Sequence, residues 1–337
     1  MVIEMSKEDF EKRLYISYLD ETTVYSINDV MYLAVVSISA SKEYYINHIE
    51  KGWADIRRKF KISDGVCLHF TDIKALLNPK YYQRPEEHRN LAMEKIFCDN
   101  RKLMTDKLYD FYSTICEFIK NCDFTIHVTG QKYLKSPMFK NKKIKDLTNG
   151  YWYPLFREHL DSMAYYFIKI AYDEYINELK TKPNAKYYNK MVKLRYDGDY
   201  ELSVRNDFRN AFSHSISNGT KRFTAKAIED IFDEIRFIDK SEIGYCGICP
   251  NDCSSKLINH AGCEIVDFIT YYAANYIAHD DMKNDYIQFD GKTDDEVEKI
   301  IQQKNTIEIG DKGKIIPIDY IYPKIFFEQA IDNRKGI

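Results

Sequence analysis

The order of β-rich and helical segments is the feature that most constrains how this 337-residue chain can fold. Near the start, three β-rich segments separated by turn residues predict an antiparallel meander at 14–20, 24–27 and 31–39. From residue 123 onward, β-rich segments alternate with amphipathic helical ones. Strands that alternate with helices form sheets covered by helices, so the chain is predicted to be an α/β protein with a mixed sheet.

The later elements are predicted from the spacing of apolar residues. Strands are expected at 123–130, 190–199 and 234–239, and helices at 153–180, 201–216 and 264–279. Helical insertions are expected at 43–60, at 71–77 and, as two helices, within 86–121. An aromatic stripe in the long helix (Tyr165, Phe167, Tyr172) is expected to be core. We expect one domain over 1–285 and a C-terminal extension, 286–337, packed on it.

Charge and composition narrow the class of protein. The net charge of −3 provides no overall field that would hold a polyanion. The N-terminal residues lack an apolar run and the longest apolar stretches are far below membrane-spanning length, so we expect a cytoplasmic protein without a membrane partner. There the eight Cys would stay reduced or bind metal. No Gly-rich phosphate loop or nucleophile elbow is present, which argues against the common nucleotide-dependent enzymes and serine hydrolases.

Acidic residues stand where predicted strands give way to turns. Asp20 closes the first predicted strand and is followed by Glu21. Asp197 and Asp199 lie in the turn that ends the strand at 190–199, and Asp239 closes the strand at 234–239. Hydrolysis of a phosphodiester by two metals needs several carboxylates around cations about 3.5–4 Å apart, and Mg²⁺ prefers oxygen ligands. Acids also begin many turns, and the Asp-Gly at 197 is typical of a tight turn, so for these residues both interpretations stay open.

A further carboxylate lies inside the predicted helix at 264–279. Asp267 has apolar residues on either side, so it should be partly buried, and a buried carboxylate must be neutral, hydrogen-bonded or bound to metal. We favour a metal ligand over a carboxylate that caps a nearby backbone group. Glu264 lies on the same helix face and is a further candidate ligand for a shared cation.

Three segments, taken in their order along the chain, resemble domain-of-unknown-function family 3800. They are YLDETT (18–23), LHFTDI (68–73), and FIDKSE (237–242) followed by CEIVDFITYYAANY (263–276). The resemblance implies a ribonuclease H-like domain with a divalent-metal nuclease centre. In that centre Asp20 and Asp267 would be core ligands of Mg²⁺ or Mn²⁺, and Asp197, Glu21, Glu264 and Asp239 would compete for the remaining places.

The same segments also contain a histidine and two departures from the family's pattern. His69 could be a ligand, a general base or a phosphate contact, or a hydrogen-bonded interior histidine. Thr22 and Thr23 stand where the family has Ser-Gly, and Glu264 stands where it has Gln. The second change adds an acid beside the implied metal centre, which either supplies a ligand or indicates an active site that has drifted.

A Cys-rich loop at 246–263 is the second candidate metal site. It contains four thiols and an imidazole: Cys246, Cys249, Cys253, Cys263 and His260. Thiolates at this density suit tetrahedral Zn²⁺, and four thiolates also suit an iron–sulfur cluster. We favour a structural zinc site over chance clustering, and it would brace the loop that precedes Asp267.

Basic residues gather in two places. Lysines at 132–145 are interleaved with Tyr133 and Phe139, and RRKFK at 57–61 forms a smaller cluster. Lysines can follow phosphates while rings stack on bases, although solvated loops share this composition. The lysine-rich patch supports a nucleic-acid partner.

These observations lead to two hypotheses. The first is a metal-dependent nuclease or another phosphodiester-processing hydrolase. The second is a catalytically inactive ribonuclease H-like module that binds protein or nucleic acid and is braced by zinc. Chemistry at the Cys cluster itself is the weakest alternative, because four protein ligands close a zinc site.

Overall fold

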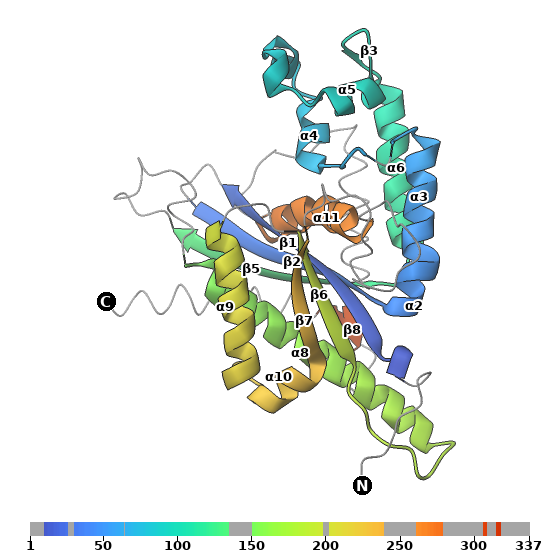
Figure 1. Cartoon of the computed structure of the whole chain (residues 1–337), viewed down its shortest axis with the longest axis vertical. Coiled ribbons are helices and arrows are strands. Elements are labelled where there is room, and N and C mark those ends of the chain that lie inside the picture. The colour runs from blue at the N-terminus through green and yellow to red at the C-terminus, as the bar shows by residue number, and fades with distance from the viewer. Residues whose placement is uncertain are drawn as a thin grey trace.

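A computed structural model describes residues 10–25, 30–63, 65–134, 150–197, 202–238, 261–278, 306–308 and 315–317. Its centre is one mixed sheet of five strands with helices on both faces (Figure 1). The strands are β1 (Leu14–Tyr25), β2 (Val30–Ser41), β5 (Thr125–Leu134), β6 (Met191–Asp197) and β7 (Phe232–Ile238). This confirms the predicted α/β class and the mixed sheet.

The strand order is β5-β2-β1-β6-β7. β1 runs antiparallel to β2, and β2 runs antiparallel to β5. On the other side β1 runs parallel to β6, and β6 runs parallel to β7. β1 is therefore the central strand, and the parallel pairs begin and end at common edges of the sheet.

The predicted division of the first 27 residues into two strands is wrong. β1 continues without a break through Glu21, Thr22 and Thr23, which pair with Val35, Ala34 and Leu33 of β2. The two threonines are β-branched and fit a strand better than a turn. Asp20 consequently lies inside β1, although the parallel pairing with β6 ends at the residue before it, where Leu19 meets Tyr196.

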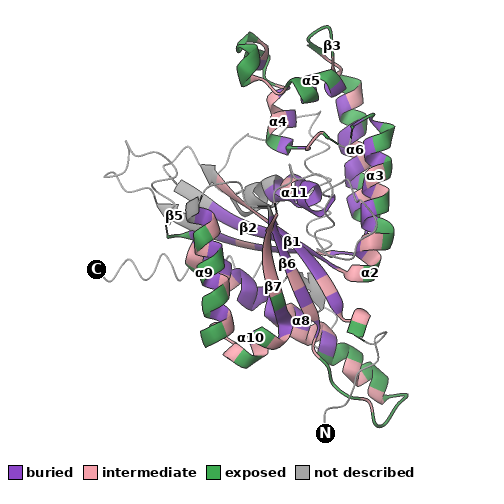
Figure 2. Cartoon of the chain, viewed as in Figure 1, coloured by how far each residue is buried: buried purple, intermediate pink, exposed green. Residues whose placement is uncertain are grey.

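Each face of the sheet has its own core. On one face lie α8 (Trp152–Leu179), α9 (Leu202–Asn218) and α10 (Ala225–Ile231); on the other lie α11 (Ala261–Ala278), α3 (Glu50–Lys59) and α6 (Thr105–Asn121) (Figure 1). Side chains of a strand alternate between faces. Tyr18 thus belongs to the core under α11 and Leu19 to the core under α8. Figure 2 shows the buried residues of both layers.

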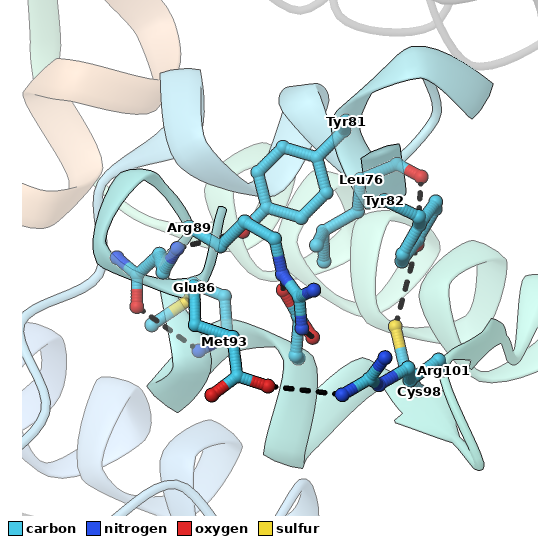
Figure 3. A network of polar contacts seen from close by, with 10 residues as sticks. Leu76, Tyr81, Tyr82, Glu86, Arg89, Met93, Cys98 and Arg101 are labelled. Atoms are coloured by element: carbon cyan, nitrogen blue, oxygen red, sulfur yellow. Dashed lines mark hydrogen bonds and ion pairs between the residues drawn. The ribbon is translucent and has the colours of Figure 1, made fainter. Parts of the chain in front are cut away.

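The predicted helical insertions lie between β2 and β5. They comprise α2 (Lys42–Tyr44), η1 (Tyr45–Ile49), α3, α4 (Phe70–Ala75), η2 (Pro79–Gln83), η3 (Glu86–His88), α5 (Leu91–Phe97), the short pair β3 (Cys98–Asp99) and β4 (Lys102–Leu103), and α6. Polar contacts hold the middle of this insertion together (Figure 3). Arg89 forms a paired ion contact with Glu94, Arg101 reaches Glu86, and the Tyr82 hydroxyl donates to the carbonyl of Leu76.

The long predicted helix is α8, and one part of its expected core stripe is wrong. Phe167 is fully buried, but Tyr172 is 54% exposed because the last turns of α8 run past the sheet (Figure 1). Of the predicted C-terminal extension, the structure describes two short paired strands, β8 (Thr306–Glu308) and β9 (Ile315–Pro317). The proposed boundary at 285 lies outside the described residues. Among the helices in the described ranges, none is both long and apolar enough to cross a bilayer.

Candidate active site

The register of the parallel strands brings the predicted acidic positions to one edge of the sheet. Asp20 follows the last residue of β1 that pairs with β6, and Asp197 is the last residue of β6, paired with Ile238. Ligands of open α/β sheets bind where parallel strands end. The side chain of Asp197 and the whole of Asp239, which follows Ile238, lie outside the described residues.

Asp20 and Glu21 point to opposite faces of the sheet. Asp20 is half-buried and alternates with Tyr18, which places it on the face that α11 covers. Glu21 accepts a hydrogen bond of 2.5 Å from the Tyr196 hydroxyl, whose ring belongs to the core under α8. The structure therefore separates the two neighbouring acids, and Asp20 is the one on the same face as Asp267.

Helix α11 is seated directly on β1 at its first turn. Gly262 lies against Tyr18 so closely that a Cβ at this position would stand 2.1 Å from the tyrosine ring. The backbone N–H of Gly262 also donates to the Tyr45 hydroxyl at 3.0 Å. Because only a glycine allows this approach, the contact fixes the start of α11 over the central strand and so sets where Asp267 stands, one and a half turns later.

Asp267 binds the segment that carries His69. Its Oδ2 accepts from the backbone N–H of Phe70 at 2.9 Å, and His69 Nδ1 lies 3.9 Å from the same oxygen. The Asp267 side chain is 12% exposed, as the predicted partial burial requires, and the His69 side chain is 46% exposed. His69 is therefore a solvent-facing histidine beside a carboxylate, and the alternative of an interior histidine is wrong.

Glu264, a predicted further ligand of a shared cation, is engaged in a set of protein contacts. Both of its oxygens accept strong donors at short range: Trp53 Nε1 at 2.6 Å, an Arg57 guanidinium nitrogen at 2.6 Å, and the Leu68 N–H at 2.8 Å. Glu264 and Arg57 are 2% and 3% exposed, so this is a buried ion pair. Its carboxylate is already neutralised and hydrogen-bonded, which suits a structural brace better than a metal ligand.

Arg57 also binds the segment that precedes His69. Its second guanidinium nitrogen donates to the carbonyls of Ser63 and Val66 at 2.8 and 2.5 Å. Glu264 then holds the N–H of Leu68, and Asp267 holds that of Phe70. Two carboxylates one turn apart on α11 thus bind alternate amides of an extended segment.

Sequence reasoning missed Arg57 and Trp53 as parts of the site. Arg57 was assigned to the basic cluster RRKFK, yet it is buried, so it is not available as a phosphate contact. Both residues meet Glu264 across more than 200 positions of sequence. The order of motifs gives no signal for such a pairing.

A second buried carboxylate, Glu50, lies near the seat of α11. It is 4% exposed, and burial raises the pKa of its carboxyl from 4.5 to about 7. In the described part of the chain its Oε2 has no hydrogen-bond partner. Burial is the main cause of the raised pKa of the hydroxyls of Tyr18 and Tyr45, whose stacked rings lie 5.1 Å apart, and repulsion from the Glu50 carboxylate adds to it.

The predicted zinc site falls almost wholly outside the described residues: Cys246, Cys249, Cys253 and His260 are not described. Cys263 is described, and it is a fully buried thiol outside any disulfide, in the core under α11. Within the described ranges, no three His, Cys, Asp or Glu side chains are grouped so that they could hold a metal ion.

Comparison with known proteins adds no relative to this description. A scan against protein-family models, a search of curated proteins and a search of solved structures each found no match.

Proposed function

We propose that the chain is a metal-dependent nuclease, or a related hydrolase of phosphodiester bonds, built on a ribonuclease H-like fold. The observation that carries the proposal is that two motif acids lie on the same face of the sheet. Asp20 stands where the parallel part of central strand β1 ends, and Asp267 stands on the helix that packs on that face of β1. A central strand flanked by one antiparallel and one parallel neighbour supports the ribonuclease H-like assignment.

The donor chemistry at this edge fits Mg²⁺ or Mn²⁺. Asp20 and Asp267 supply carboxylate oxygens, which hard divalent cations prefer, and the register adds the position of Asp197. A bound cation would polarise the phosphoryl group and lower the pKa of a bound water. Glu21 and Glu264 do not fit this set, because one faces the opposite core and the other is held by Arg57.

His69 fits the role of a substrate contact or proton carrier. An imidazole can donate to a phosphate oxygen or carry a proton, and this one is exposed beside Asp267. Its backbone neighbours Leu68 and Phe70 are fixed by Glu264 and Asp267, so the position of the ring is constrained on both sides. We therefore include His69 among the active-site residues and treat Glu264 as a positioning residue.

A specific observation favours a second candidate function. The hydrogen bond from Phe70 gives Asp267 a structural task that needs no cation. A catalytically inactive module that binds nucleic acid or protein would keep this bond and lack turnover. A zinc ion in the Cys-rich loop, as predicted, would be compatible with both candidate functions.

The test is cleavage of labelled single- and double-stranded DNA and RNA in Mg²⁺, Mn²⁺ or EDTA. We expect cleavage that depends on metal and is lost in Asp20→Asn and in Asp267→Asn. Asp55→Asn is the matched control, since Asp55 is an exposed acid on α3. Cleavage that survives both substitutions, or that persists in EDTA, would reject the assigned site. Absence of cleavage with every substrate would favour the binding module.

A further inference from the structure

The end of α8 and the loop that leads to β6 form a surface rich in exposed tyrosines. Tyr172 is 54% exposed, Tyr187 40% and Tyr188 37%. Figure 1 shows this end of α8 projecting past the strands, and Figure 2 shows exposed residues along it. Large rings that remain in water on a rigid helix and a short loop offer flat apolar faces to a ligand.

The rings are supported by one another and by cations. Tyr187 packs its ring edge-to-face with Tyr175 of α8, with centroids 5.9 Å apart, and Tyr172 lies one turn before Tyr175 on the same helix. The guanidinium of Arg13 lies 3.6 Å over the ring of Tyr188. These contacts restrict the rings of Tyr187 and Tyr188 before a ligand binds, which lowers the entropy lost on binding.

The loop between α8 and β6 is also basic. Residues 180–190 contain four lysines and no acid. Lys190 pairs with Glu174, and Lys180 donates to the side-chain oxygen of Asn177. Lys182 and Lys186 are exposed, and within the described residues neither has an ion pair.

We propose that this tyrosine–lysine surface, comprising Tyr172, Tyr187, Tyr188, Lys182 and Lys186, binds single-stranded nucleic acid. Lysines that contact phosphates beside rings that stack on bases are what strand binding without sequence preference requires. Protein-binding patches are also rich in tyrosine, but they are depleted in lysine, so the exposed Lys182 and Lys186 favour nucleic acid.

The surface is separate from the candidate active site. The loop enters β6 at Met191, whereas the acidic edge lies where β6 ends at Asp197. Seven residues of strand place these two ends roughly 20 Å apart. Binding at the tyrosine–lysine surface therefore does not depend on cleavage and can be measured without it.

The experiment is fluorescence anisotropy with the full chain in EDTA, in an Asp267→Asn background so that no probe is cut. The probes are labelled oligo-dT and oligo-U of about 20 nucleotides, a duplex of equal length, and heparin. Tyr187→Ala should weaken single-strand binding about fivefold or more, because each stacked base contributes at least about that factor. Tyr109→Ala, which changes an exposed tyrosine of α6, is the matched control.

The lysines give a second, independent readout. Lys182→Gln combined with Lys186→Gln should reduce the steepness of the plot of log affinity against log salt by about 1.4, the value for two phosphate contacts on a single strand. The control pair is Lys51→Gln with Lys120→Gln, both exposed on α3 and α6. Circular dichroism checks that each variant is folded.

Selective loss of single-strand binding in both sets of variants, with the controls unchanged, supports the proposal even if no nuclease activity is found. Binding that is unaffected by the tyrosine change, or heparin binding of equal strength, would overturn it in favour of a plain polyanion surface. Failure of every nucleic-acid probe to bind would overturn it outright.

Discussion

Replacement of Glu50 by Gln should remove one pH-dependent contribution to the stability of the protein. The carboxyl of Glu50 is 4% exposed, and burial raises its pKa from 4.5 to about 7. The folded chain therefore holds a proton that the unfolded chain releases between these two values. The contribution of Glu50 to stability should be greatest below pH 4.5 and fall as the pH rises toward 7, because in that window unfolding of a chain with this group releases a proton.

The size of the effect follows from the two pKa values. At about 1.4 kcal/mol for each tenfold change in the protonation equilibrium, the full difference amounts to about 3 kcal/mol. About 2.5 kcal/mol of it should appear between pH 5 and pH 8. Glu50→Gln removes the titrating group, so relative to wild type the variant should gain this amount over that interval. At low pH the variant should be no more stable than wild type, because the protonated Glu50 carboxyl is neutral, as the amide of Glu50→Gln would be.

The assay is urea unfolding of the two proteins at pH 5, 6, 7 and 8, with the difference in free energy of unfolding plotted against pH. Glu43→Gln on α2 is the control, because Glu43 is exposed and the same chemical change there should give a flat line. A flat line for Glu50→Gln as well would show that Glu50 is ionised in the fold and would refute the reasoning.

Three further perturbations test the packing around the site. Arg57→Met leaves Glu264 buried without its cation and should lower the free energy of unfolding by about 3–5 kcal/mol, against less than about 1 kcal/mol for the exposed Arg58→Met; equal losses in urea would contradict the brace. Gly262→Ala forces a methyl group against a β1 ring and should cost about 1–3 kcal/mol by thermal unfolding; an unchanged melting temperature would contradict that contact. Burial lowers the pKa of His127 from 6.5 to about 3, so the contribution of His127 to the free energy of unfolding should fall by about 2 kcal/mol from pH 7 to pH 5. The difference between wild type and His127→Gln in urea should change by that amount over this interval, and an unchanged difference would contradict it.

The sheet and its covering helices could be predicted because their patterns are local. Apolar alternation predicted the strands that became β5, β6 and β7, and helical spacing predicted α8, α9 and α11 to within a few residues at most ends. The prediction failed at 20–27, where two β-branched threonines continue β1 although the acids before them suggested a turn. Residues 21–25 remain in the strand because they pair with β2, and a local sequence pattern holds no information on that pairing.

Part of the candidate site could also be predicted. The apolar neighbours of Asp267 correctly indicated partial burial. The hydrogen bonds around it could not be predicted. Arg57 and Trp53, which bind Glu264, belong to α3 and are more than 200 residues away along the sequence. An arginine in a basic run resembles a solvated cation until the tertiary structure supplies a buried partner. The exposure of Tyr172 was not predicted for a similar reason, because apolar spacing does not show where a helix extends beyond the sheet that it covers.

The assignment of Asp20 and Asp267 to one metal centre is tested most directly by anomalous diffraction from crystals soaked in Mn²⁺. The account predicts one or two anomalous peaks bound by both carboxylates, with two cations about 3.5–4 Å apart if both are present. It also predicts no peak at Glu264, whose oxygens are held by Arg57 and Trp53. Density at neither aspartate, or carboxylates too far apart to share a cation, would contradict the proposed active site.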